Sequence, residues 1–117
     1  MSVEKLQNAY YVTGDMERAV GFYRDALGLD LVFQDGAKWT QFKAGGVNFA
    51  MASEDEAPDT AAGATVVFEV DDIAAMSASI VSAGGELLGE RDMGDHGKTL
   101  TFRDPDGNLV QLYQRAS

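Results

Sequence analysis

The same order of sequence signals occurs twice in this chain of 117 residues, and this internal repeat limits the possible folds more than any other feature. Each half has a β-rich run, an aspartate suited to cap a helix, an apolar stripe with helical spacing, and three further strand-like runs. The two capping aspartates, Asp15 and Asp72, lie 57 residues apart. Such a repeat predicts two similar units that pack together.

The periodicity predicts a βαβββ order in both halves. Helices are expected near residues 15–27 and 72–84. An acidic stretch of small residues at 53–63 separates the halves and reads as a linker. The expected strands cover residues 6–12, 29–34, 38–43 and 47–52, and then 65–70, 86–90, 98–103 and 109–114.

One domain is expected over residues 1–117, with module one at about 4–53, a linker at about 54–63 and module two at about 64–115. A unit of about 55 residues struggles to bury both a helix stripe and a sheet face, whereas two units can pair. We therefore predict an α+β fold in which helices cover one face of each curved, mixed sheet. The other face is left partly open, as a cleft for a small molecule.

Composition excludes several classes of protein. The chain has no cysteine, which rules out disulfides, thiolate nucleophiles and iron–sulfur clusters. Its net charge of −10 opposes binding to a phosphate backbone, so no nucleic-acid partner is expected, while a cationic ligand would be attracted. No apolar run is long enough to span a membrane, and the N-terminus lacks the pattern of a secretory signal. We expect a cytoplasmic protein without a membrane partner.

Two motifs resemble those of a known family. The segment VTGDMERAVGFYRDALGLDL is similar to the first helix signature of the vicinal oxygen chelate superfamily, and FRDPDGNLVQLYQ is similar to its terminal hairpin. That superfamily includes glyoxalase I, bleomycin resistance proteins and extradiol dioxygenases. The βαβββ repeat extends the resemblance over nearly the whole chain. The resemblance implies the fold, but no particular reaction.

The resemblance also implies where a divalent metal would be held, on four strand positions that carry His, Gln or Glu in the enzymes of the family. None of the matching positions here carries histidine or a carboxylate, so the set predicts neither a metal nor another cofactor. It also offers no strong base for glyoxalase-type proton transfer. The matching positions are Gln7 or Asn8, Ala50 (with Asn48 as the alternative), Thr65 and Gln111.

Strand alternation indicates which side chains line the cleft. Trp39 is either an aromatic wall for a planar ligand or a half-buried strand residue at a dimer seam. The register leaves Tyr10 or Tyr11 as a second aromatic, and His96 is either an exposed loop residue or a ligand contact at the cleft mouth. The residues expected to bind the ligand are Tyr11, Trp39, Gln41, Asn48, Thr65, Glu69, His96, Thr101, Gln111 and Tyr113.

These observations favour a metal-free binding protein that resembles bleomycin resistance proteins and sequesters a cationic or planar drug or metabolite. No catalytic residue is assigned. The alternative is a glyoxalase-type lyase or isomerase, or a dioxygenase-like enzyme of the same superfamily. A homodimer is expected, because edge strands leave unpaired backbone groups that a second copy can cover and because small members of the superfamily usually dimerise.

Overall fold

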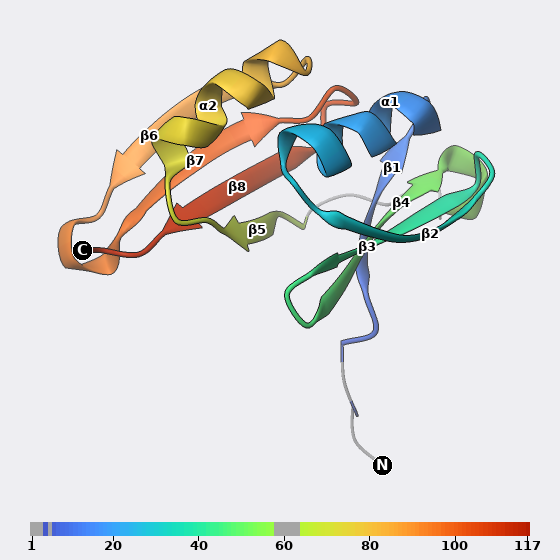
Figure 1. Ribbon diagram of the computed structural model, residues 1–117, viewed down its shortest axis with the longest axis horizontal. Helices are drawn as coiled ribbons and strands as arrows, with labels where there is room; N and C mark the ends of the chain where they lie inside the picture. The colour runs from blue at the N-terminus through green and yellow to red at the C-terminus, as the bar shows by residue number, and fades with distance from the viewer. Residues whose placement is uncertain (1–3, 5, 58–63) are drawn as a thin grey trace.

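The computed structural model describes residue 4, residues 6–57 and residues 64–117, and it contains one βαβββ arrangement twice (Figure 1). Part of the predicted linker forms a 3₁₀ turn, η2 (Glu54–Glu56), and residues 58–63 lie outside the described residues. Module one consists of β1 (Ala9–Thr13), α1 (Met16–Gly21), a π-helical turn η1 (Phe22–Ala26), β2 (Asp30–Asp35), β3 (Trp39–Ala44) and β4 (Val47–Ser53). Module two consists of β5 (Val66–Glu69), α2 (Ile73–Ser82), β6 (Glu86–Asp92), a 3₁₀ turn η3 (Gly94–His96), β7 (Lys98–Arg103) and β8 (Leu109–Gln114).

Each module forms its own four-stranded sheet, and the two sheets have the same strand order. The first sheet runs β1-β4-β3-β2 and the second runs β5-β8-β7-β6. In each sheet the first strand of the module pairs in parallel with the last, and the other pairs are antiparallel. The predicted α+β fold with two tandem modules is confirmed. Neither helix within the described ranges has the length and apolar character needed to cross a membrane.

The two predicted caps begin the two helices. The Asp15 carboxylate accepts a hydrogen bond from the Arg18 backbone N–H at 3.2 Å, and the Asp72 carboxylate accepts one from the Ala75 backbone N–H at 3.3 Å. Both aspartates have extended backbone angles, as N-cap residues do. Because these two residues stand at the same place in each module, the repeat seen in the sequence is also a repeat in space.

The first helix differs from the prediction in its second half. It leaves α geometry after Gly21 and continues as the π-helical turn η1. This wider turn places two consecutive aromatic rings against different sheets. Phe22 lies 6.2 Å from Phe102 of the second sheet, and Tyr23 lies 5.0 Å from Phe49 of the first. The spacing of apolar residues predicts a helix here but carries no signal for the change in pitch.

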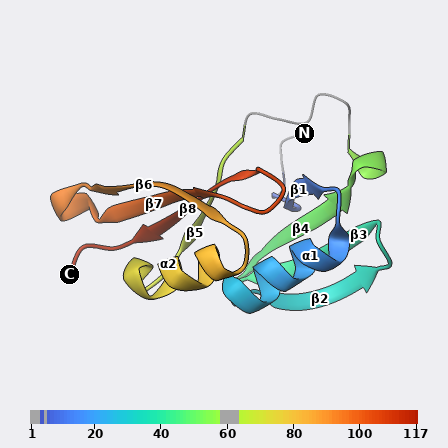
Figure 2. The ribbon, with the colours of Figure 1, turned by 90° about the horizontal axis from the view of Figure 1, so that it is seen from above.

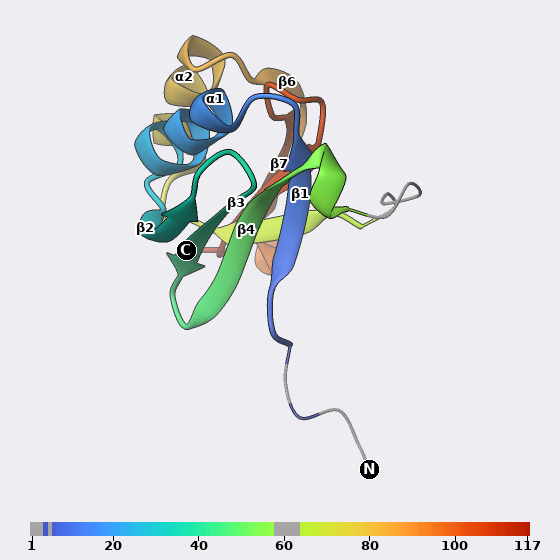
Figure 3. The ribbon, with the colours of Figure 1, turned by 90° about the vertical axis from the view of Figure 1, so that its right-hand side faces the viewer.

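The two modules meet through the faces that their helices cover, which we call the helix faces. Figures 2 and 3 show α1 and α2 next to each other on one side of the molecule, with a sheet extending from each. Phe49 on the helix face of the first sheet lies 5.2 Å from Phe68 on the helix face of the second. One buried hydrophobic cluster therefore includes side chains of both modules. The opposite face of each sheet, which we call its open face, points away from this shared core.

The turn between β7 and β8, residues 104–108, is seated on module one. Its Asp106 carboxylate accepts hydrogen bonds from the Thr13 hydroxyl at 2.6 Å and from the Gly14 backbone N–H at 3.1 Å. The Arg18 guanidinium forms an ion pair at 2.6 Å with the carboxylate oxygen that also accepts from Gly14. Three donors from the β1–α1 corner of module one thus converge on one carboxylate of module two.

Asp104, at the start of the same turn, is buried, and its hydrogen bonds link the two modules within the core. Its carboxylate accepts hydrogen bonds from the Tyr23 hydroxyl and the Asn108 side-chain amide, both at 2.9 Å. The Asn108 amide also donates to the Val12 carbonyl at 2.9 Å. Burial raises the pKa of the Asp104 carboxyl, and the hydrogen bonds from Asn108 and Tyr23 oppose this rise.

A third link comes from Tyr11 on β1, whose ring lies in the shared core. Its hydroxyl accepts a hydrogen bond from the Val66 backbone N–H at 2.6 Å and donates one to the Leu109 carbonyl. Burial raises the pKa of this phenol, so it stays protonated and able to donate at neutral pH. One hydroxyl of module one therefore satisfies two backbone groups at the start of β5 and β8.

Replacing Tyr11 by phenylalanine should lower the free energy of unfolding by about 1–3 kcal/mol, because the Val66 N–H and the Leu109 carbonyl lose their partner. Urea denaturation followed by circular dichroism measures the change. Tyr10→Phe is the matched control, since it removes a half-exposed hydroxyl on the open face, and it should change stability by less than about 0.5 kcal/mol. Equal losses in the two variants would contradict the role of Tyr11.

Asp104 should make stability depend on pH in a defined direction. Since its pKa is raised in the folded state, the native protein takes up a proton more readily than the unfolded chain, and this contribution to stability is lost as pH rises through the folded pKa. Asp104→Asn does not titrate. The excess stability of the wild type over this variant should therefore be larger at about pH 4 than at about pH 7.

Paired urea titrations at the two pH values give this difference. Asp95→Asn, in the exposed turn η3, removes the same charge and serves as control. A gap between wild type and Asp104→Asn that shrinks on acidification would contradict the predicted sign.

Candidate functional site

The open face of the first sheet carries an aromatic pair. Tyr10 on β1 and Trp39 on β3 have ring centroids 5.2 Å apart and planes inclined by 53°. The Trp39 indole N–H donates to the Gln41 side-chain oxygen at 3.3 Å, which orients the ring. Between the two strands runs β4, which brings Ala50 beside Tyr10 and Ala52 beside Trp39. Both alanines are fully buried, and their small side chains allow the larger rings to approach each other above the sheet.

A β-bulge adds a third aromatic side chain to this face. The pairing of β2 with β3 shifts between Leu31 and Phe33, so that Leu31 pairs with Phe42 and Phe33 pairs with Gln41. Phe33 therefore lies on the open face and is 48% exposed. The prediction from alternation did not find Phe33, because a bulge on an edge strand changes the register without a sequence signal of its own.

The open face of the second sheet is hollow and more polar. A cavity of about 500 Å³ lies over it and is bordered by side chains of β6, β7 and β8. The Gln111 amide on β8 donates to the Thr101 hydroxyl on β7 at 3.1 Å, which fixes two polar groups in its floor. Gly89 pairs with Thr101 and contributes no side chain, which leaves room above the pair. The cavity is lined by Leu88, Gly89, Glu90, Arg91, Met93, Thr99, Thr101 and Gln111.

The end of the second sheet is closed by the turn that contains His96. The Tyr113 hydroxyl donates to the His96 carbonyl at 3.0 Å, and the His96 side chain is exposed. Gly97 next to it is buried, and an added Cβ would collide with the Gln114 carbonyl and the Tyr113 ring. Tyr113 therefore holds this turn in place, and His96 does not line the cavity.

The structure distributes the predicted ligand-binding residues over two separate faces. Trp39, Gln41 and Asn48 belong to the open face of the first sheet. Glu69, Thr101, Gln111 and Tyr113 belong to that of the second, where Glu69 forms an ion pair with Arg115 at 3.1 Å. Thr65 is exposed and immediately precedes β5. Since the helix faces meet inside the chain, the two open faces do not oppose each other within one copy.

Tyr11 is a correction to the predicted set. β1 pairs Tyr11 with Met51 and Tyr10 with Ala50, which places Tyr11 in the core and Tyr10 on the open face. Of the two tyrosines that the sequence left as alternatives, Tyr10 is therefore the one on the open face. The sequence could not decide it, because two consecutive tyrosines fit a strand in either register.

The residues at the family's metal positions do not fit a divalent transition metal. Alternation back from Tyr10 places Asn8 rather than Gln7 on the open side. Ala50 has no donor atom, and the Gln111 amide is engaged with Thr101. No group of three or more His, Cys, Asp or Glu side chains that could bind a metal comes together in the described part of the chain. Such neutral, incomplete donor sets bind transition metals poorly.

Comparison with solved structures finds the same fold in proteins of several activities. A glyoxalase-related enzyme from Fulvimarina pelagi matches with a TM-score of 0.81 and 20% identity, covering 97% of this chain and 89% of that one. A point mutant of the fosfomycin resistance protein FosX from Listeria monocytogenes, in complex with Mn(II) and 1S,2S-dihydroxypropylphosphonic acid, matches with a TM-score of 0.79 and 17% identity, over 98% and 93% of the chains. At these identities the likeness concerns the fold alone.

An antibiotic-binding protein, TnmS3 from Streptomyces sp. CB03234, matches with a TM-score of 0.74 and 27% identity, over 99% of both chains. Comparison with curated proteins returned no match. The family model of the Glyoxalase/Bleomycin resistance protein/Dioxygenase superfamily matches residues 5–112. With this match over most of its length, and with two tandem βαβββ modules, the chain belongs to the Glyoxalase/Bleomycin resistance protein/Dioxygenase superfamily.

Proposed function

We propose that this protein binds and sequesters a planar small molecule, without chemical conversion, on the aromatic open face of the first sheet. The observation that carries the proposal is the Tyr10–Trp39 pair, which stands beside Ala50, where the family's enzymes place a metal ligand. An aromatic surface without a metal donor suits stacking rather than Lewis-acid chemistry. The likeness to TnmS3, which is an antibiotic-binding protein, supports the same proposal.

The proposed ligand is cationic or neutral rather than anionic. The net charge of −10 creates a field that attracts cations, and Asp35 pairs with Trp39 across β2 and β3, beside the aromatic surface. A cation above an aromatic ring gains a further attraction from the electrons of the ring. The chemistry of this face therefore favours a planar, positively charged guest.

The complete cleft is proposed to form between two copies of the chain. Within one copy the helix faces are buried against each other, so the aromatic open face and the polar open face are not opposed. A second copy can place its polar open face over the aromatic one and, by symmetry, form two equivalent clefts. Exposed apolar side chains on both faces, Phe33 and Val67 among them, would be covered in this arrangement.

Trp39→Ala should weaken the binding of a planar cationic dye such as acridine orange by about tenfold, because the stacking surface and its cation–π attraction are lost. Trp39→Phe keeps an aromatic ring and should lose clearly less. Fluorescence titration gives both affinities, and thermal melts verify that each variant is folded. The planar anion anthraquinone-2-sulfonate should bind more weakly than the dye. Unchanged affinity in Trp39→Ala would contradict the proposed binding face.

Sedimentation at micromolar concentration should give a single species of twice the 12.5 kDa chain mass.

A complementation experiment then tests whether two chains build each cleft. Trp39→Ala damages the aromatic half, and Thr101→Trp fills the polar half. Each variant alone should bind the dye about tenfold more weakly than the wild type or worse, whereas an equilibrated mixture should regain about a quarter of the wild-type sites at full affinity, because each mixed dimer has one intact cleft. No recovery, or a species of 12.5 kDa, contradicts the shared cleft.

The enzymatic alternative makes the opposite prediction about metal. Protein purified without chelators should contain far less than one divalent transition ion per chain, since Asn8, Ala50, Thr65 and Gln111 offer a poor donor set. Elemental analysis measures the content. Stoichiometric metal together with turnover of a hemithioacetal or a catechol would replace the binding function by an enzymatic one.

A further inference from the structure

The two modules differ most in the turn before their last strand. In module two this turn, residues 104–108, carries Asp104, Asp106 and Asn108, which bond to module one. In module one, β3 and β4 are joined by Gly45 and Gly46 alone. The two turns occupy equivalent places, because each joins the third and fourth strands of a sheet with the same strand order.

The repeat of 57 residues identifies the surface that corresponds to the seat of the 104–108 turn. Thr13, at the end of β1, corresponds to Val70, directly after β5, since Asp15 corresponds to Asp72. Tyr11, whose hydroxyl joins the modules, corresponds to Phe68, which has none. The two positions whose hydroxyls join the modules in one half of the molecule are therefore apolar in the other half, where the facing β3–β4 turn offers only Gly45 and Gly46.

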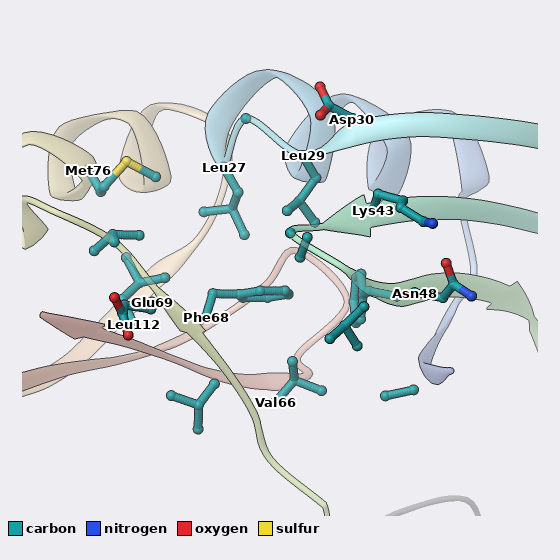
Figure 4. Close-up of a pocket in the computed structure, with 18 residues that line it drawn as sticks. Leu27, Leu29, Asp30, Lys43, Asn48, Val66, Phe68, Glu69, Met76 and Leu112 are labelled. Atoms are coloured by element: carbon teal, nitrogen blue, oxygen red, sulfur yellow. The ribbon is translucent and has the colours of Figure 1, made fainter. Parts of the chain in front are cut away.

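A cavity of about 530 Å³ lies at this place, between the β3–β4 turn of module one and β5 and α2 of module two (Figure 4). A Cβ built on Gly45 or on Gly46 meets no atom within 4 Å, so nothing in the chain fills the space beside the turn. Figure 4 shows Leu27, Leu29 and Phe68 directed into the space. The apolar lining is contributed by Leu27, Leu29, Phe49, Val66, Phe68, Met76 and Leu112.

The charged groups at the rim are balanced. Asp30 lies opposite Lys43 in the register of β2 and β3, and Glu69 forms an ion pair with Arg115 at 3.1 Å. Both acids thus have a basic neighbour, and the rim favours neither a cation nor an anion. The volume lies within the range of about 300–1,000 Å³ that is usual for small-molecule sites and is too small for a folded partner.

We propose that this inter-module cavity is a second binding site, for a neutral, apolar small molecule such as an aryl or branched alkyl compound. It is distinct from the Tyr10–Trp39 surface and from the Thr101–Gln111 cavity, because none of these four residues lines it. Asn48, Val67 and Glu69 of the open faces contribute to its lining beside the apolar side chains of the helix faces. Its occupant would contact both modules. Binding there would therefore fix their relative orientation and stabilise the fold.

The neutral fluorophore N-phenyl-1-naphthylamine serves as probe, since its emission rises in an apolar environment. The wild-type protein should bind it saturably, with one probe per chain. Met76→Trp fills the cavity from α2 and should weaken binding by at least tenfold. Val81→Trp, on the exposed side of the same helix, is the matched control and should leave the affinity unchanged.

Ala44→Phe fills the same cavity from module one and keeps the test decisive if Met76→Trp does not fold. Trp39→Ala removes the aromatic surface of the open face and should leave binding of the probe unchanged. The test of the inter-module cavity is therefore independent of the test of the proposed function. Absence of saturable binding, or binding that is lost in Trp39→Ala and retained in the folded cavity variants, would overturn the proposal.

Discussion

The buried carboxylate of Asp104 is the interaction on which the arrangement of the two modules depends. It receives the Tyr23 hydroxyl from one module and the Asn108 amide from the other, and the turn that it begins also places Asp106 against the β1–α1 corner. Burying a charged carboxylate costs free energy unless the carboxylate accepts hydrogen bonds, so the fold requires these donors. Loss of one of them would leave a buried charge under-satisfied at the junction, and the strain would reach both sheets.

This mode of joining explains why the functional surface is divided. The modules bury their helix faces together, so their open faces are turned outward, one lined by Tyr10, Trp39 and Phe33 and the other by Thr101 and Gln111. Neither surface is a closed cleft. The family resemblance leads one to expect a single cleft, whereas within one copy of this chain the two open faces point apart and do not enclose one.

Most of the fold could be predicted from the sequence because its signals are local. Asp15 and Asp72 are helix caps with the expected geometry. The alternation on β4 and β8 correctly places Phe49, Met51, Val110 and Leu112 in the core, whereas Val47 at the start of β4 is 51% exposed. The predictions that failed concern the register of strands and the pitch of the first helix, which local sequence patterns do not encode. Tyr10 and Tyr11 are alike in sequence, and only the pairing with β4 shows which one faces inward. The bulge that exposes Phe33 is seen only in the pairing of β2 with β3. The π-turn after Gly21 goes with the packing of Phe22 and Tyr23 against different sheets, which the local sequence does not encode.

The links between the modules join the beginning of the chain to its end. Tyr11 and Leu109 are 98 positions apart, and Thr13 and Asp106 are 93 apart. During synthesis the first strand leaves the ribosome well before the segment that bonds to it, roughly 5–20 seconds earlier at ordinary elongation rates. Until then the β1–α1 corner lacks the acceptor for the Thr13 hydroxyl and the Gly14 N–H. Module one therefore completes its native contacts only after the last hairpin has been made, so a nascent chain truncated before residue 104 should remain sensitive to proteases and dependent on chaperones.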